Sequence, residues 1–113
     1  MKSKITRNHF STEAEALVEI AEAKYFPLTI DVPAEKNDVH WHDFDTMLFM
    51  LDGALTATEA ESGETFTVTK GDRVVATNGI LHHENHNGFK AVFGFSADPS
   101  TFTMPINKPP LDA

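Results

Sequence analysis

The pattern of apolar and polar residues divides the chain into a short helical part and a longer strand-rich part. From Thr12 to about Lys24 the apolar residues recur every three to four positions, which predicts an amphipathic α-helix. Thr12 and Glu15 have the spacing of a capping box, in which each side chain satisfies a backbone N–H at the helix start. The apolar side of this helix is expected to contain Ala14, Leu17, Val18, Ala21 and Tyr25, and the opposite side Glu15, Glu19 and Glu22. That acidic side is either a partner site or a solvated surface, and the usual behaviour of amphipathic helices favours the solvated surface.

After Pro27 the helical period disappears, and short apolar runs separated by turn residues predict strands. The candidate strands are Leu28–Val32, Thr46–Leu51, Ala54–Glu61, Thr65–Thr69, Arg73–Thr77, His82–His86 and Lys90–Ser96. The turns expected between them are Asp52-Gly53, Ser62-Gly63, Lys70-Gly71-Asp72, Asn78-Gly79 and Asn87-Gly88. Asp-Gly and Asn-Gly are strong hairpin signals because both residues tolerate positive φ, and this spacing is typical of an antiparallel sandwich or barrel. The proline-containing tail, 104–113, is expected to lie as an irregular strap over the surface.

Composition narrows the possible partners and chemistry. The chain has 113 residues, which suits a single domain over 1–113, and its nine Phe allow a core without disulfides. The lack of cysteine excludes thiolate ligands and thiol nucleophiles, and it suits a reducing cytoplasm. A net charge of −8 makes nucleic acid a poor partner, because phosphate binding relies on clustered Lys and Arg. The sequence shows neither a signal peptide after Met1 nor an apolar run long enough to span a membrane, so no membrane partner is expected.

Two histidines with strand spacing form the first half of a candidate metal site. His40 and His42 are two residues apart, so on a strand both side chains leave the same face, with Cα atoms about 6.6 Å apart. Imidazoles at that spacing can bind one ion at distances of roughly 2.1 Å, and His82, at the start of a later strand, can supply a third ligand. A His-x-His pair alone is more often solvent-facing than metal-binding, so the case for a metal site depends on the sequence pattern around the pair. Trp41 points the other way, either to a dimer interface or into its own subunit.

Other residues near His82 are candidates of a different kind. Glu84 has the same strand parity and either lines the site as a candidate acid–base residue or extends to solvent at the barrel mouth. His86 lies about 13 Å from His82 along an extended strand and His83 has the opposite parity, so neither is expected to bind the same ion. Four apolar strand residues form either plain core, which is favoured because Phe and Met are usually buried, or cavity walls: Leu48, Met50, Phe93 and Phe95.

Two spaced motifs make the sequence resemble the cupin superfamily. The first cupin motif is His-x-His, an acid four positions later, then six residues and a Gly; here it spans residues 40–53. The second motif is Gly, five residues, Pro-x-Gly, two residues, His, three residues and Asn; here it spans residues 71–86. Both spacings match without a gap, and the resemblance covers half of the chain. It implies an all-β fold, a double-stranded β-helix (jelly-roll barrel) with one short N-terminal α-helix, the site inside the barrel, and a homodimer.

Three positions depart from the cupin motifs. Thr46 stands where cupins usually have a ligand Glu, Thr77 replaces the Pro, and His86 replaces the Asn. A hydroxyl is a poor metal ligand beside a carboxylate, so Thr46 is expected near the site without binding the ion. Met50 is expected near the site as well. Asp45, one position early, is expected to face away unless a bulge turns it inward.

The expected ligand set is therefore His40, His42 and His82 plus water around one divalent transition metal ion. Fe, Mn, Ni, Zn and Cu all accept imidazole, and the sequence does not choose among them. Three neutral ligands leave the full charge on the ion and open positions for water, O₂ or a chelating anion. The resemblance adds that three-histidine cupins include Fe(II) enzymes that cleave C–C or C–S substrates with O₂.

These expectations lead to three interpretations. The first is a metal-dependent enzyme, dioxygenase-like, that acts on a small oxygenated molecule. The second is a non-enzymatic cupin that binds or senses a small ligand. The third is a structural dimer whose former site has decayed, although all three histidines remain.

Overall fold

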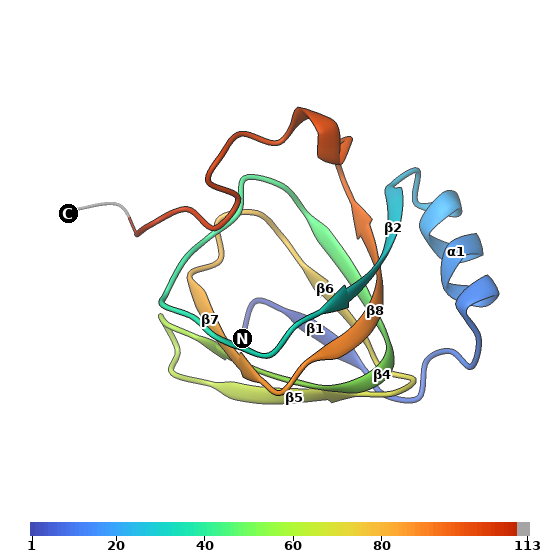
Figure 1. The fold of residues 1–113 in the computed structure, drawn as a ribbon, viewed down its shortest axis with the longest axis horizontal. Coiled ribbons are helices and arrows are strands. Elements are labelled where there is room, and N and C mark those ends of the chain that lie inside the picture. The colour runs from blue at the N-terminus through green and yellow to red at the C-terminus, as the bar shows by residue number, and fades with distance from the viewer. Residues whose placement is uncertain (111–113) are drawn as a thin grey trace.

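One long strand joins the two parts of a curved antiparallel sheet in the computed structural model, which describes residues 1–110. This strand, β4 (Thr46–Glu59), pairs with β6 and β8 through its first half and with β5 and β7 through its second half. The sheet curls into a barrel, with α1 outside it beside β2 and β8 (Figure 1). The other elements are β1 (Lys4–Thr6), α1 (Glu13–Glu22), β2 (Phe26–Val32), β3 (Glu35–Lys36), β5 (Thr65–Thr69), β6 (Arg73–Ala76), β7 (His82–His86), β8 (Phe89–Phe95) and the 3₁₀ turn Pro99–Thr101. The expected all-β fold with one short N-terminal α-helix is confirmed.

Most predicted strands are present with bounds shifted by a residue or two, but the hairpin predicted at Asp52-Gly53 is wrong. Strand β4 runs straight through that dipeptide, with an irregular register between Met50 and Asp52 and with Gly53 at φ 81°. The left-handed glycine here accommodates a bulge that bends the strand and does not reverse it. A dipeptide signal cannot separate these outcomes, because both need a residue that tolerates positive φ.

The helix begins as expected, because the backbone N–H of Glu15 donates to the Thr12 hydroxyl at 3.2 Å. Its buried face is not the predicted one. Ala16 and Ile20 are fully buried, whereas Val18, predicted on the apolar side, is 58% exposed. The helix lies so close to β8 that a Cβ at Gly94 would come within 3.0 Å of Ile20, so this close packing decides the face. No helix in the described part of the chain is long and apolar enough to cross a membrane.

On the predicted solvated side of the helix Glu15 and Glu22 are exposed as expected, but Glu19 takes part in an ion pair. Glu19 is half-buried, and its carboxylate lies 2.5 Å from Nη1 of Arg73 and 2.6 Å from Nε2 of His9. These contacts tie α1 to β6 and to the N-terminal arm. Burial alone would raise the pKa of Glu19, but hydrogen bonds from Arg73 and His9 outweigh it and lower that pKa.

The apolar run of β4 serves two hydrophobic clusters because successive side chains point to opposite faces of the sheet. Leu48 and Met50 pack inside the barrel, and Met47 and Phe49 pack beneath α1. Met50 is fully buried, which agrees with the core position favoured for it from the sequence.

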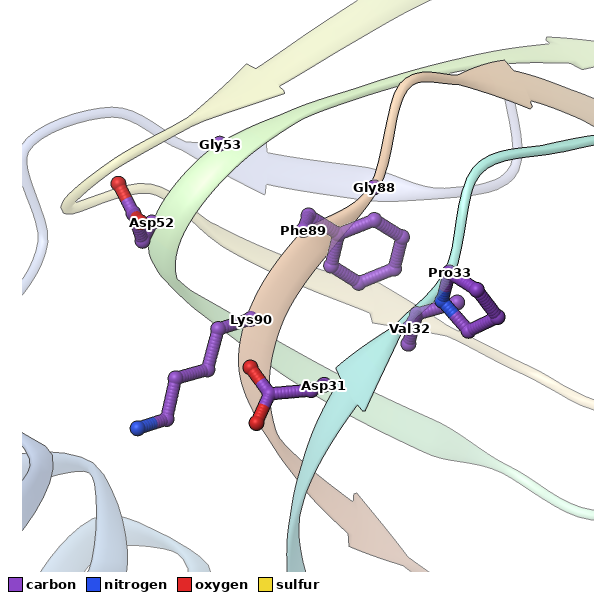
Figure 2. Close-up of a pocket in the computed structure, with 8 residues that line it drawn as sticks. All are labelled: Asp31, Val32, Pro33, Asp52, Gly53, Gly88, Phe89 and Lys90. Carbon is purple, nitrogen blue, oxygen red and sulfur yellow. The ribbon is translucent and has the colours of Figure 1, made fainter.

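Gly53 offers a stability test, because it lies where β4 approaches the turn before β8 (Figure 2). A Cβ added at Gly53 would lie 2.7 Å from the carbonyl oxygen of Gly88, a backbone atom that cannot rotate away. We expect Gly53→Ala to lower the free energy of unfolding by about 3 kcal/mol, from strain at positive φ and from overpacking. Urea unfolding measures this difference.

Gly63→Ala is the matched control. Gly63 also has a positive φ, of 73°, but a Cβ there meets no atom within 4 Å. It should therefore lose only about 1–2 kcal/mol for the left-handed conformation. Equal losses in the two variants would show that the approach to Gly88 is not what constrains residue 53.

Candidate metal centre

Two segments far apart in the sequence pair side by side and carry the candidate ligands. His40 and His82 form an antiparallel bridge in which each backbone N–H donates to the other's carbonyl at 2.9 Å. The same pairing continues on either side, since the N–H of Gly79 donates to the carbonyl of His42 and that of Asn37 to the carbonyl of Glu84. The first histidine segment thus extends the pairing of β3 with β7.

This pairing brings three imidazoles and one carboxylate together. The ring centroids of His40, His42 and His82 lie 4.4–5.1 Å apart. One ligand atom from each of these rings and one from Glu84 all lie within 4.8 Å of one another. That separation suits four atoms that surround a single ion at the usual metal–ligand distances of about 2 Å.

The backbone sets which nitrogen of each imidazole faces the cluster. Nδ1 of His40 lies 2.7 Å from the carbonyl oxygen of Asp38, and Nδ1 of His82 lies 2.7 Å from that of Ile80. Nδ1 of His42 lies 3.0 Å from the carbonyl oxygen of Ile106. A carbonyl only accepts, so each Nδ1 carries a proton and donates it. Each neutral ring is left with its lone pair on Nε2, which is the arrangement of metal-binding histidines.

Glu84 completes the group. Its Oε1 lies 2.9 Å from Nε2 of His82 and 3.2 Å from Nε2 of His40, and its side chain is only 21% exposed. Asn37 orients it: the amide Nδ2 donates to Oε2 at 3.3 Å, while the backbone N–H of Glu84 donates to Oδ1 of Asn37. The structure therefore places the Glu84 carboxylate beside the three histidines, not extended into solvent. The expected set of three histidines and water becomes a group of three histidines and one carboxylate.

Burial and mutual attraction shift the pKa values of three members of the group in different directions. Burial by itself would raise the pKa of Glu84, but the attraction of the His40 and His82 rings outweighs it and holds that pKa well below its usual range. Burial would lower the pKa of His40, yet the Glu84 carboxylate and the Asp38 carbonyl raise it overall. Burial lowers the pKa of His42, and its neighbouring histidines add to this effect. Glu84 is thus an anion near neutral pH and His42 a neutral base.

The donor set fits a divalent transition metal ion. Nε2 of His40 is buried and has no hydrogen-bond partner, because the Glu84 oxygen at 3.2 Å is close enough for charge attraction but poorly directed for a hydrogen bond. A buried polar atom without a partner is costly, and a cation in the cluster would satisfy it. Three imidazole nitrogens and one carboxylate oxygen suit Fe, Mn, Ni, Zn or Cu.

The other predicted residues lie outside this group. Thr46 shares the barrel-facing parity of β4 with Leu48 and Met50. Asp45 accepts from the backbone N–H of Asn78 at 2.8 Å and so holds the loop after β6. His86 is buried, with Nδ1 accepting from the N–H of Gly88 at 3.1 Å.

Two further features also lie apart from the group. Trp41 is half-buried and contacts the chain's own tail, since its indole N–H donates to the carbonyl of Pro109 at 2.8 Å. The predicted strap is irregular over the described residues 104–110, and 111–113 lie outside them.

A pocket of about 350 Å³ lies elsewhere, between β2, β4 and β8 (Figure 2). Its lining contains none of the four clustered residues: Asp31, Val32, Pro33, Asp52, Gly53, Gly88, Phe89 and Lys90.

Comparison with known proteins identifies the fold of this chain but not its chemistry. No family model and no curated protein matches the chain. A DUF861 family protein from Thermotoga maritima aligns with a TM-score of 0.54 and 18% identity, over 80% of this chain and 96% of its own. A DUF861 family protein of unknown function from Pseudomonas syringae pv. tomato aligns with a TM-score of 0.58 and 15% identity, over 62% of this chain. The match spans only 30% of that longer protein.

The chain has the fold of the small cupins. The WlaRB TDP-quinovose 3,4-ketoisomerase from Campylobacter jejuni has it as well, with a TM-score of 0.56 and 12% identity over 74% of this chain and 68% of its own. These likenesses confirm the predicted jelly-roll barrel. The chemistry of this cupin-fold chain has to be argued from its own residues, because one fold serves many activities.

Replacing Glu84 tests the fourth member of the cluster. We expect Glu84→Gln, which keeps the volume and removes the charge, to weaken Co²⁺ binding by about tenfold or more. Only neutral imidazole binds metal, so affinity in the native protein should fall as pH drops through the raised pKa of His40. Without the carboxylate this decline should begin at a lower pH. Chelator competition across neutral pH measures both effects.

Glu22→Gln is the control, because it removes one negative charge from an exposed position on α1. It should leave the affinity and its pH profile unchanged. An unchanged profile in Glu84→Gln would show that Glu84 neither binds the ion nor influences His40.

Proposed function

We propose that this chain binds one divalent transition metal ion through His40, His42, His82 and Glu84. The observation that carries the proposal is that three Nε2 lone pairs and one carboxylate converge while every Nδ1 proton is held by a backbone carbonyl. Without a cation this arrangement gathers electron-rich atoms in a buried place, which is unfavourable. When bound, such an ion acts as a Lewis acid toward oxygen atoms of a small ligand.

We further propose that the chain is a metal-dependent enzyme, dioxygenase-like, that acts on a small oxygenated molecule. Four protein ligands leave positions open on a six-coordinate ion for such a ligand or for O₂. The cupin fold supports catalysis in a structural neighbour named as a sugar-nucleotide ketoisomerase. The Glu84 carboxylate reduces the charge that three histidines alone would leave on the ion. Because it contacts two of the ligand rings, Glu84 serves as a ligand better than as a free acid–base residue.

The chain's own residues prepare the site for an anionic or oxygen-rich ligand. The backbone carbonyls of Asp38 and Ile80 hold their two rings rigidly, because each belongs to the residue two positions before the histidine it orients. The Phe44 ring stacks against His42, with centroids 5.1 Å apart, and restricts its rotation. A metal ion held here would displace a proton from the Nε2 atoms of the cluster. The histidine rings then have little rotational freedom left to lose when a ligand binds.

The test begins with protein purified without a histidine tag and measured for bound transition metal before and after reconstitution. We expect about one ion per chain, lost in His82→Ala and kept in His83→Ala, since His83 lies on the other face of β7. Oxygen uptake is then followed with diketones, thiols and hydroxy acids. Uptake that depends on His82 supports the enzyme.

Each of the other outcomes contradicts one part of the proposal. Absence of metal after reconstitution contradicts the metal site itself. Metal binding with ligand-induced spectral changes, but without turnover of any compound, favours the alternative of a non-enzymatic binding or sensing protein.

We also propose a homodimer in the cytoplasm. Leu17 and Val18 of α1 and Phe26 and Leu28 of β2 are exposed, on elements that contact each other. Large exposed apolar groups on neighbouring elements are typical of interaction surfaces. Light scattering is expected to give twice the chain mass, and Leu28→Asp to give the chain mass. A monomeric native protein would contradict the dimer.

A further inference from the structure

The three imidazoles of the cluster are oriented in two different ways. His40 and His82 donate to carbonyls of their own segments, two residues earlier in each case. His42 donates to Ile106, 64 residues further along the chain. The local backbone is therefore sufficient to orient the His40 and His82 rings, whereas the orientation of the His42 ring depends on a long-range contact with the tail. We call residues 103–110 the C-terminal strap.

The strap is bound to the histidine segment next to His42. The backbone N–H of Trp41 donates to the carbonyl of Lys108 at 3.0 Å, and the N–H of Lys108 donates back to the carbonyl of Trp41 at 2.9 Å. The Trp41 indole adds its bond to Pro109. These three bonds join the strap to Trp41, the residue before His42, so a displacement of the strap would reach the His42 ring.

The Lys108 side chain holds the strap in the shape that presents the Ile106 carbonyl. Its Nζ donates to the carbonyl oxygens of Thr103 and Pro105 at 3.1 and 3.0 Å and to the Thr103 hydroxyl at 2.9 Å. The Thr103 hydroxyl in turn donates to Asp43, the residue after His42. Asp43 also lies 3.8 Å from Nζ, in a loose ion pair. One amine thus closes the loop of the strap on both sides of the Ile106 contact.

We propose that the C-terminal strap is a built-in part of the metal site, with Ile106 and Lys108 acting as positioning residues for His42. The Ile106 carbonyl keeps the proton of His42 on Nδ1 and so turns Nε2 toward the cluster. A metal on Nε2 would polarise the ring and strengthen the Nδ1–H bond to Ile106. Metal binding and strap attachment are then coupled, and each favours the other by the same factor. This inference rests on the proposed metal site.

A graded series of full-length variants tests the coupling, with Co²⁺ as the probe and chelator competition as the measurement. Lys108→Met removes only the amine bonds, and Lys108→Pro also removes the backbone N–H that donates to Trp41. We expect several-fold weaker Co²⁺ binding in the first variant and about tenfold or more in the second. Lys70→Met, the same change at an exposed position between β5 and β6, should leave the affinity unchanged.

A double-mutant cycle separates positioning of His42 from general support of the fold. If the strap acts through His42, Lys108→Pro should cause no further loss of Co²⁺ affinity in a His42→Ala background. Equal losses in both backgrounds would contradict the proposal. A second readout is amide hydrogen exchange at Trp41, whose N–H donates to Lys108 and should exchange more slowly with Co²⁺ than without it.

The outcomes distinguish this inference from the proposed function. If native protein binds no Co²⁺, the metal site and this inference both fail. The native protein and Lys108→Pro could bind Co²⁺ equally well, with the same amide exchange rate at Trp41 with and without the metal. In that case only the proposed role of the strap fails. Should Lys108→Pro not fold, Lys108→Met and the exchange measurement on native protein decide the question by themselves.

Discussion

Every strand of the barrel is placed by hydrogen bonds to β4 or to a strand that pairs with β4. This is possible because β4 continues for 14 residues and bends at its bulge, so that one strand reaches both parts of the sheet. The register of β7 on β4 places Glu84 opposite Ala57 and His82 opposite Glu59. Since side chains alternate along a strand, His82 and Glu84 share a face, and that register fixes which face of the sheet it is. The candidate site therefore inherits its geometry from the central strand.

Within the site, charge and hydrogen-bond direction matter more than packing. The backbone carbonyls at the three Nδ1 atoms remove the tautomer freedom of the histidines and leave three bases facing one carboxylate. The Glu84 carboxylate raises the pKa of His40 and the neighbouring rings lower the pKa of Glu84, so mutual attraction favours a proton on the cluster. A divalent cation would replace that proton. The same geometry that stabilises the protonated cluster thus prepares it for metal.

Sequence patterns predicted most of the fold for a clear reason. Strands such as β5 and β7 coincide with their predicted bounds, because apolar alternation between turn residues has few other interpretations. The failures arose where one local signal is compatible with two structures. Asp52-Gly53 suits a hairpin or a bulge, and α1 has apolar residues on more than one side. Its contact with Gly94 of β8 selected Ala16 and Ile20 for burial, and helix periodicity carries no information about that partner.

The sequence by itself determined the identity of the three histidines and the motif spacing that resembles cupins, because both are properties of residue order. Only the tertiary structure decided that Glu84 joins them and that Ile106 orients His42. The position of Glu84 depends on how β7 pairs with the His40 segment, and any residue has the backbone carbonyl that Ile106 supplies. A contact made by a backbone atom across 64 residues leaves no mark in the side-chain pattern, so it becomes visible only when the chain is folded.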